Sequence, residues 1–211
     1  MSLQAAANGM DADNDILFLI LTSHGSRAGL AVKAGRLTQT LTPSNLAYML
    51  ARTGMRYKVV VISACYSGVF IPRLANPDTL VITAADADHP SFGCRDKAKW
   101  TYFGNAFFNM ALRQAKSLKD AFVVARSLVK KREVRERFEP SNPLMAGGEN
   151  VQPLLIARPR ATGRLRGRRL SAENRVRIDL MTEARRMSAN GTQPKSLSRP
   201  MSALRTGAAI P

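Results

Sequence analysis

Two short segments of the chain carry residue types that perform nucleophilic catalysis in enzymes. One is SHGS at 23–26, and the other, about forty residues later, is SACYSG at 63–68. A free thiol has a pKa of about 8.5, so it needs help to react as a thiolate near neutral pH. A neighbouring imidazole can hold the thiol proton and later give it to a leaving amine. Cys65 is therefore a candidate nucleophile, and His24 is a candidate general acid/base.

Backbone groups beside these two residues could stabilise a developing negative charge. Gly25 follows His24 directly and permits a close approach of the backbone. Its N–H and the N–H of Cys65 are candidate donors of an oxyanion hole, because acyl transfer commonly uses backbone amides in this way. Taken alone, a cysteine after an apolar run is more often an inert core residue, and a His-Gly pair more often belongs to a turn.

The surrounding pattern predicts the scaffold that would bring the two segments together. Three apolar runs, at 16–21, 59–62 and 80–82, show no alternation with polar residues. Such runs are typical of strands that are buried on both faces of a parallel sheet. In open α/β sheets, ligands bind at the carboxyl ends of the parallel strands. His24 and Cys65 follow two of these runs, so they meet at one edge if the strands are neighbours.

Helical patterns separate or follow the apolar runs. Thr42 and Pro43 have the cap and first-turn residue types of a helix that ends at Gly54. Phe103 and Phe107 share the face of a second helix, and Ser117 begins a third through a capping pattern. A weak last strand is predicted at 153–156.

Composition divides the 211 residues into two parts. Residues 157–211 contain thirteen basic and three acidic residues and no Phe, Tyr or Trp, although the whole chain is 45% hydrophobic. We therefore predict a folded domain at 1–156 and a basic tail of low order at 157–211, which has helical rhythm only at 171–187. Such a tail should be dispensable for stability and catalysis.

Other features of the sequence argue against a membrane helix, a signal peptide, a metal site and a second catalytic thiol. No apolar run approaches the roughly 20 residues of a membrane helix, and the start lacks the pattern of a signal peptide, so the chain as written is expected to be cytoplasmic. Two cysteines and two histidines offer no zinc site of usual spacing, and no cofactor is expected. Cys94 is interpreted as a bystander thiol in a loop. His89, beside Asp86 and Asp88, is interpreted as part of a solvated turn.

The two segments together resemble the His-Gly and Ala-Cys signature of the legumain family, cysteine peptidases of the caspase-type fold (clan CD). The resemblance continues through LVITAADADHPSFGCRDKAKWTYFGNAFF at 80–108, covers about 15–130, and is nearest to bacterial legumain-like peptidases. It implies a three-layer α/β/α caspase-hemoglobinase-like domain with a mostly parallel sheet. It also implies that His24 is the general acid/base, that Cys65 is the nucleophile, and that Gly25 and Cys65 form the oxyanion hole. The substrate would be a peptide or a protein.

The sequence departs from the family at the substrate pocket and at its start. Ser63 and Asn105 stand where legumains have acidic pocket residues, and with Ser91 they could line a polar S1 pocket. The family's first strand and helix have no counterpart before Asp15. We therefore expect a peptidase domain that is incomplete at its N-terminus, with an unpaired sheet edge beside residues 16–21 and little activity.

Two other functions remain open from the sequence. The chain could be a catalytically impaired homologue that acts as a binding module. It could also bind nucleic acid through its arginine-rich tail by counterion release. The tail has no aromatic residues for base stacking and no recognisable module, so a solvated tail is the preferred interpretation.

A first prediction concerns specificity. Ser63 and Asn105 remove two negative charges that could accept hydrogen bonds from an asparagine amide at P1. We expect weaker discrimination in favour of asparagine at P1 than legumains show, measured by profiling a peptide library. A profile dominated by asparagine would contradict this expectation.

Overall fold

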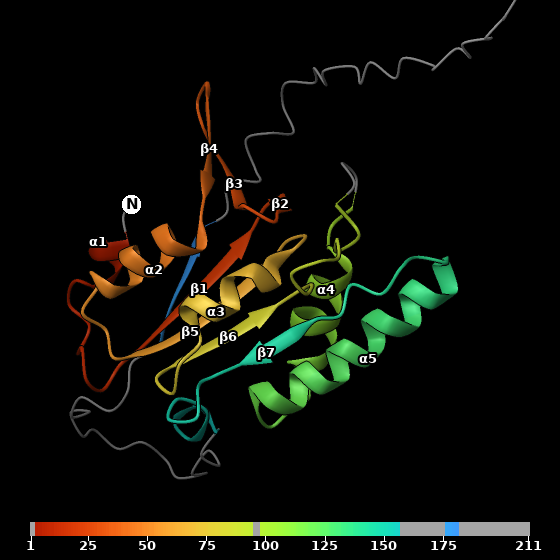
Figure 1. Cartoon of the computed structure of the whole chain (residues 1–211). Helices are drawn as coiled ribbons and strands as arrows, with labels where there is room; N and C mark the ends of the chain where they lie inside the picture. Colours follow the sequence, from red (N-terminus) through yellow and green to blue (C-terminus); the bar gives the residue numbers. More distant parts are fainter. Residues whose placement is uncertain (1–2, 95–97, 157–175, 182–211) are drawn as a thin grey trace, which may run out of the picture.

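A five-stranded sheet forms the centre of the fold, and helices cover both of its faces (Figure 1). The computed structural model describes residues 3–94, 98–156 and 176–181. The strand order is β7-β6-β5-β1-β8. The parallel strands are β1 (Ile16–Thr22), β5 (Tyr57–Ser63), β6 (Thr79–Thr83) and β8 (Val176–Met181), and β7 (Leu144–Ala146) is antiparallel. The structure thus has the three-layer α/β/α architecture with a mostly parallel sheet that the sequence predicts.

The central strands are buried on both faces. Val59 and Val61 of β5 belong to one hydrophobic cluster, and Val60 and Ile62 belong to the cluster on the other face of the sheet. None of these four side chains has exposed surface. Because neighbouring residues of a strand point to opposite faces, a strand covered on both sides must be apolar at every position. This is why the runs do not alternate.

Short helices cover the first face of the sheet. They are α1 (Leu3–Ala7), α2 (Pro43–Ala51), the 3₁₀ helix η1 (Ser67–Phe70) and α3 (Ile71–Leu74). The hydroxyl of Thr42 caps α2 by accepting from the backbone N–H of Asn45 at 3.2 Å, as its residue type predicts. Beyond α2 the chain turns at Gly54, whose φ is +71°, a conformation that favours glycine.

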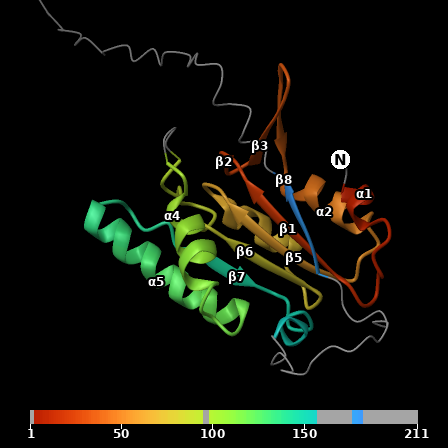
Figure 2. The same cartoon turned by 180° about the vertical axis from the view of Figure 1, so that it is seen from behind.

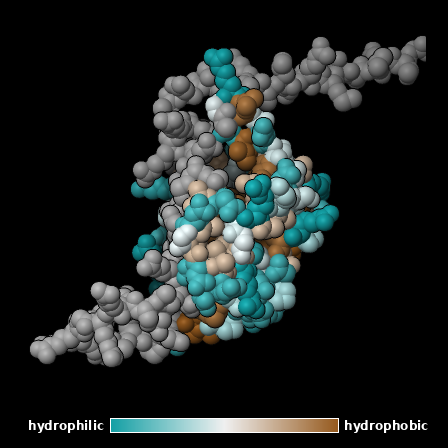
Figure 3. Space-filling model, turned by 90° about the vertical axis from the view of Figure 1, so that its left-hand side faces the viewer, coloured by the Kyte–Doolittle hydropathy of each residue, from teal (hydrophilic) through white to brown (hydrophobic). Residues whose placement is uncertain are grey.

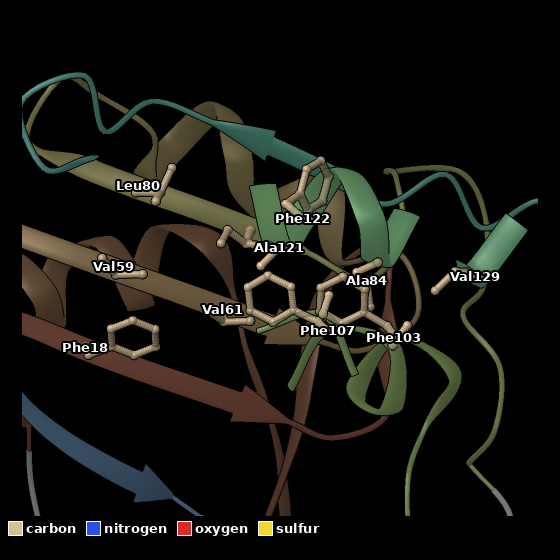
Figure 4. Close-up of a cluster of buried hydrophobic side chains, with 14 of the residues drawn as sticks. Phe18, Val59, Val61, Leu80, Ala84, Phe103, Phe107, Ala121, Phe122 and Val129 are labelled. Carbon is tan, nitrogen blue, oxygen red and sulfur yellow. The ribbon is translucent and has the colours of Figure 1, made fainter. Parts of the chain in front are cut away.

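The second face is covered by helices that include α5, the longest described helix with 19 residues. These are α4 (Tyr102–Gly104), the π-helical segment η2 (Asn105–Ala111) and α5 (Leu118–Glu136). Ser117 caps α5 by accepting from the N–H of Asp120 at 3.1 Å. Figure 4 shows Phe103, Phe107 and Phe122 gathered against the strand side chains of this cluster. Burying each such aromatic side chain is worth about 2–3 kcal/mol.

A small second sheet begins directly after β1 and extends away from the central sheet. It consists of β2 (Gly25–Ser26), β3 (Gly29–Ala34) and β4 (Leu37–Leu41), and it was not predicted from the sequence. Its hairpin projects from the body in Figure 1, and Figure 3 shows hydrophobic side chains on this projection above a mostly hydrophilic face. Leu37 near its tip is 65% exposed.

The outer edge of β1 is paired with a strand from the C-terminal region. β8 runs parallel to β1 with Ile16 opposite Val176 and Leu21 opposite Met181, and both views show it beside β1 (Figures 1 and 2). This differs from the expected low-order tail, from the helical rhythm at 171–187 and from the expected unpaired edge. The physical reason is that β1 offers a full row of backbone hydrogen-bonding groups on this side. The other residues of 157–211 lie outside the described part of the chain, and the division at 156 stays a prediction.

The strand predicted at 153–156 is wrong. Residues Gln152–Leu155 form a 3₁₀ helix, η3, whose first turn contains Pro153. Proline has no N–H for a ladder hydrogen bond and its φ suits the first turn of a helix. The edge of β6 is instead taken by β7, which pairs Val81 with Ala146 and Thr83 with Leu144. Among the described residues, no helix is long and apolar enough to cross a membrane.

The pairing of β8 predicts that the C-terminal region supports the fold. We expect a chain that ends at Ile156 to melt at a clearly lower temperature than the full chain, because β1 then has an unpaired edge. A chain that ends at Met181 keeps β8 and is the matched control, expected to melt near the full chain. Equal melting temperatures for all three, measured by circular dichroism, would contradict a stabilising role of β8.

Candidate active site

The register of the sheet places the two catalytic candidates at one edge. Thr22, the last residue of β1, is opposite Ser63, the last residue of β5. His24 and Cys65 each follow two residues later. The two strands are neighbours, which is the condition under which the sequence places His24 and Cys65 at one edge, and the backbones of the two loops are in contact at Gly25. The His24 side chain is exposed, and the Cys65 side chain is half-buried.

Gly25 brings the two loops into backbone contact. A Cβ atom at Gly25 would overlap the carbonyl oxygen of Cys65 and would lie 3.1 Å from the Cβ of Ala64. Only glycine permits this approach. The loop is fixed on its other side, because the carbonyl of His24 accepts from the N–H of Ala31 at 2.9 Å and the Ser23 hydroxyl donates to the carbonyl of Ala31 at 2.6 Å. The backbone of the predicted base is thus held between the nucleophile loop and the hairpin.

The Cys65 thiol lies against the loop that follows β6. Its Sγ donates to the carbonyl oxygen of Ser91 at 3.3 Å, and the Ser91 hydroxyl lies 3.8 Å from the same sulfur. Tyr66, the next residue, has a φ of +55° in the left-handed region, and its N–H donates to the carbonyl of His89 at 3.0 Å. The turn after Cys65 is therefore tied to the β6 loop by backbone as well as side-chain contacts.

Of the three predicted pocket residues, the structure places one, Ser91, in contact with this thiol. Ser63 is buried at the end of β5, and its hydroxyl lies 3.1 Å from the hydroxyl of Thr101. Asn105 is half-buried at the start of η2, and its backbone N–H donates to the carbonyl of Thr101 at 2.9 Å. Its side-chain oxygen accepts from Asn109 at 2.9 Å. Thr101 joins two of the three residues and was missed by the sequence analysis.

An aromatic cluster anchors the loop that carries Ser91. Phe92 stacks on Phe138 with ring centroids 4.4 Å apart, and its carbonyl accepts from the N–H of Tyr102 at 3.0 Å. The Tyr102 hydroxyl donates to Glu136, and the Arg132 guanidinium lies 3.6 Å from the centroid of the Tyr102 ring. The hydrogen bond from Tyr102, followed by that from Arg132, lowers the pKa of Glu136 to about 2. The end of α5 therefore holds an ionised carboxylate against the base of the Ser91 loop.

Arg27 connects the histidine loop to the turn after the nucleophile. Its guanidinium lies 5.5 Å from the centroid of the Tyr66 ring and pairs with Asp88 at 3.4 Å. Both charged side chains are exposed, so the ion pair contributes little to stability. The residues are 61 apart in sequence, and no sequence pattern links them. Within the described parts of the chain, no group of three or more His, Cys, Asp or Glu is placed to hold a metal ion.

The contact at Gly25 gives a sharp mutational prediction. In Gly25→Ala, the new methyl group must displace the Cys65 loop, and a shift of about 1 Å at a catalytic site costs about 100-fold in rate. We expect at least that loss in kcat/KM towards peptide substrates. Gly35→Ala is the control, since its Cβ position is open space; its φ of +62° strains an alanine in the turn between β3 and β4, away from Cys65. Wild-type kcat/KM in Gly25→Ala would show that the approach is not needed.

Comparison with known proteins adds evidence that is independent of this geometry. No curated protein matches the sequence significantly. The sequence model of the Peptidase C13 family matches residues 6–149. That match spans more than half of the chain and includes every predicted site residue. The chain belongs to the peptidase C13 family, the legumain family of cysteine peptidases.

Proposed function

We propose that the chain is a cysteine endopeptidase that cleaves peptide bonds through an acyl-enzyme on Cys65, with His24 as general acid/base. Family membership supports a cysteine peptidase in general. The observation that carries the specific proposal is the contact between Gly25 and the carbonyl of Cys65. It brings the backbone of the residue after the histidine against the backbone of the residue that bears the thiol, and this supports a joint role for the two segments.

The reaction follows from the chemistry of these groups. The Cys65 sulfur attacks the carbonyl carbon of the scissile bond while its proton passes to the His24 imidazole. The N–H groups of Gly25 and Cys65 donate to the oxyanion. As the C–N bond breaks, His24 gives the proton to the leaving amine and a thioester remains on Cys65. His24 then takes a proton from water, which attacks the thioester and releases the acid. An amine in place of water would give transpeptidation.

The three candidate pocket residues also favour a neutral polar S1 pocket. Ser63, Ser91 and Asn105 offer hydroxyl and amide groups, which donate and accept hydrogen bonds without charge. Of the three, Ser91 contacts the thiol directly, through its carbonyl oxygen at 3.3 Å. Such a pocket suits a P1 side chain with both a donor and an acceptor, and it does not provide an ionic partner for lysine or arginine.

The two cysteines give a direct test of the nucleophile. Burial raises the pKa of the Cys94 thiol, and the nearby charge of Cys65 raises it further, so Cys94 is mostly protonated and a weak nucleophile at neutral pH. We expect Cys65→Ala to abolish peptide hydrolysis and labelling by a thiol-reactive peptide probe. Cys94→Ala is the control and should retain most of both.

Two outcomes would contradict the proposal in different ways. Loss of labelling in Cys94→Ala but not in Cys65→Ala would show that Cys65 is not the nucleophile. A folded wild-type chain whose Cys65 resists the probe, and which cleaves no peptide of a broad library, would favour the binding-module function instead. Mass spectrometry of the labelled peptide identifies the cysteine in either case.

A further inference from the structure

The carboxylate of Asp86 is the centre of a hydrogen-bonded cluster beside the nucleophile. Its Oδ1 accepts from the backbone N–H groups of Asp88 and His89, both at 2.8 Å. Its Oδ2 lies 2.7 Å from Nδ1 of His89 and accepts from the side chain of Asn142 at 3.1 Å. The loop after β6 is thus folded around this one side chain. The catalytic chemistry described above does not use it.

The backbone of Asp86 joins two further segments to the same point. Its N–H donates to the carbonyl of Ser141 at 2.9 Å, and its carbonyl accepts from the N–H of Gly68 at 3.3 Å. A Cβ atom at Gly68 would lie 2.5 Å from the carbonyl carbon of Asp86, so the two backbones are packed tightly. Gly68 belongs to the turn that begins at Cys65. Asp86 therefore lies where the β6 loop, the nucleophile turn and the segment before β7 meet.

His89 carries the effect of Asp86 to the nucleophile. Asp86 fixes both the ring and the backbone N–H of His89, and the carbonyl of His89 in turn accepts from the N–H of Tyr66. That hydrogen bond holds Tyr66 at a positive φ that non-glycine residues rarely adopt. The orientation of the Cys65–Tyr66 peptide depends on this hydrogen bond. The direction of the Cys65 backbone and thiol follows from the orientation of that peptide.

We propose that Asp86 is a positioning residue, which acts through His89 to hold the turn after Cys65 and the Ser91 loop in reactive geometry. The proposal rests on the proposed function of Cys65. Asp86 and His89 touch no reacting atom, so their effect is on the arrangement of groups that do. The interpretation of His89 as part of a solvated turn is thereby replaced by a structural link to the site.

The electrostatics of Asp86 agree with this role. Burial raises the pKa of its carboxyl, but the hydrogen bonds from Asp88, Asn142 and His89 lower it by more, so the net pKa lies below the ordinary value. The group is consequently ionised at neutral pH and accepts from all of its partners. An amide at this position has one oxygen and one NH₂ group, so it keeps half of the acceptors and turns donors towards His89 and Asn142.

The test compares Asp86→Asn and His89→Ala with Asp78→Asn in the full chain. Asp78 precedes β6 at the opposite end of the strand, where it accepts from Asn150 at 2.8 Å, and it is the matched control. We expect Asp86→Asn to lower kcat about 10- to 100-fold with KM within about threefold, as misplacement at a catalytic site predicts. His89→Ala, which keeps the backbone N–H contact, should lose less, and Asp78→Asn should keep the wild-type kcat.

A second readout separates this proposal from the proposed function. The rate at which iodoacetamide alkylates Cys65, followed by mass spectrometry of its peptide, requires no peptidase activity. We expect this rate to fall at least about fivefold in Asp86→Asn and to remain unchanged in Asp78→Asn. Unchanged kcat and unchanged alkylation in both Asp86→Asn and His89→Ala would overturn the positioning role, even if the melting temperature fell. If Asp86→Asn does not fold, His89→Ala decides by the same two measurements.

Discussion

Parallel pairing of β1 with β5 determines where both catalytic candidates lie. The register that sets Thr22 opposite Ser63 also aligns the loops that follow, so the backbone at Gly25 reaches the carbonyl of Cys65. A slip of one residue would move every side chain of β1 to the opposite face of the sheet. Because β1 packs into different hydrophobic clusters on its two faces, such a slip would disturb both. The geometry of the site is therefore set by the packing of the core.

The loops of the site are held by hydrogen bonds and by one aromatic cluster. Tyr66 keeps its left-handed backbone because His89 accepts its N–H, and Ser91 approaches the thiol because Phe92 is anchored next to it. α5 contacts the segments next to both loops. Its buried Glu133 accepts from the N–H of Ser141, and Glu136 in its last turn accepts from Tyr102. One helix thus packs its apolar face on the sheet and supports the site with its carboxylates.

Most of the scaffold could be predicted from the sequence, because its signals are local. The three buried strands, the caps at Thr42 and Ser117 and the neighbouring positions of His24 and Cys65 follow from apolar runs and capping residues. The hairpin after Gly25 was missed because its strands are short and largely exposed. β8 was missed because its partner lies more than 150 residues earlier in the chain, and no local pattern reports such a pairing. The roles of Thr101 and Asp86 depend on contacts between distant loops, which the sequence does not display.

Because of β8, the strand before His24 is paired on both of its edges. β1 pairs on one side with β5, about forty residues later, and on the other side with a strand from the most basic region of the sequence. Closing a long loop costs more entropy than closing a short one, so the β1–β5 pair can form before β8 adds to it. β8 also belongs to residues 157–211, which carry +10 of the chain's formal net charge of +17. Charge repulsion of that kind opposes compaction, and the backbone hydrogen bonds gained along β1 offset it. The completed sheet therefore combines a core that local sequence specifies with an edge that depends on long-range pairing. β1 belongs to both, and His24, the candidate catalytic histidine, follows it.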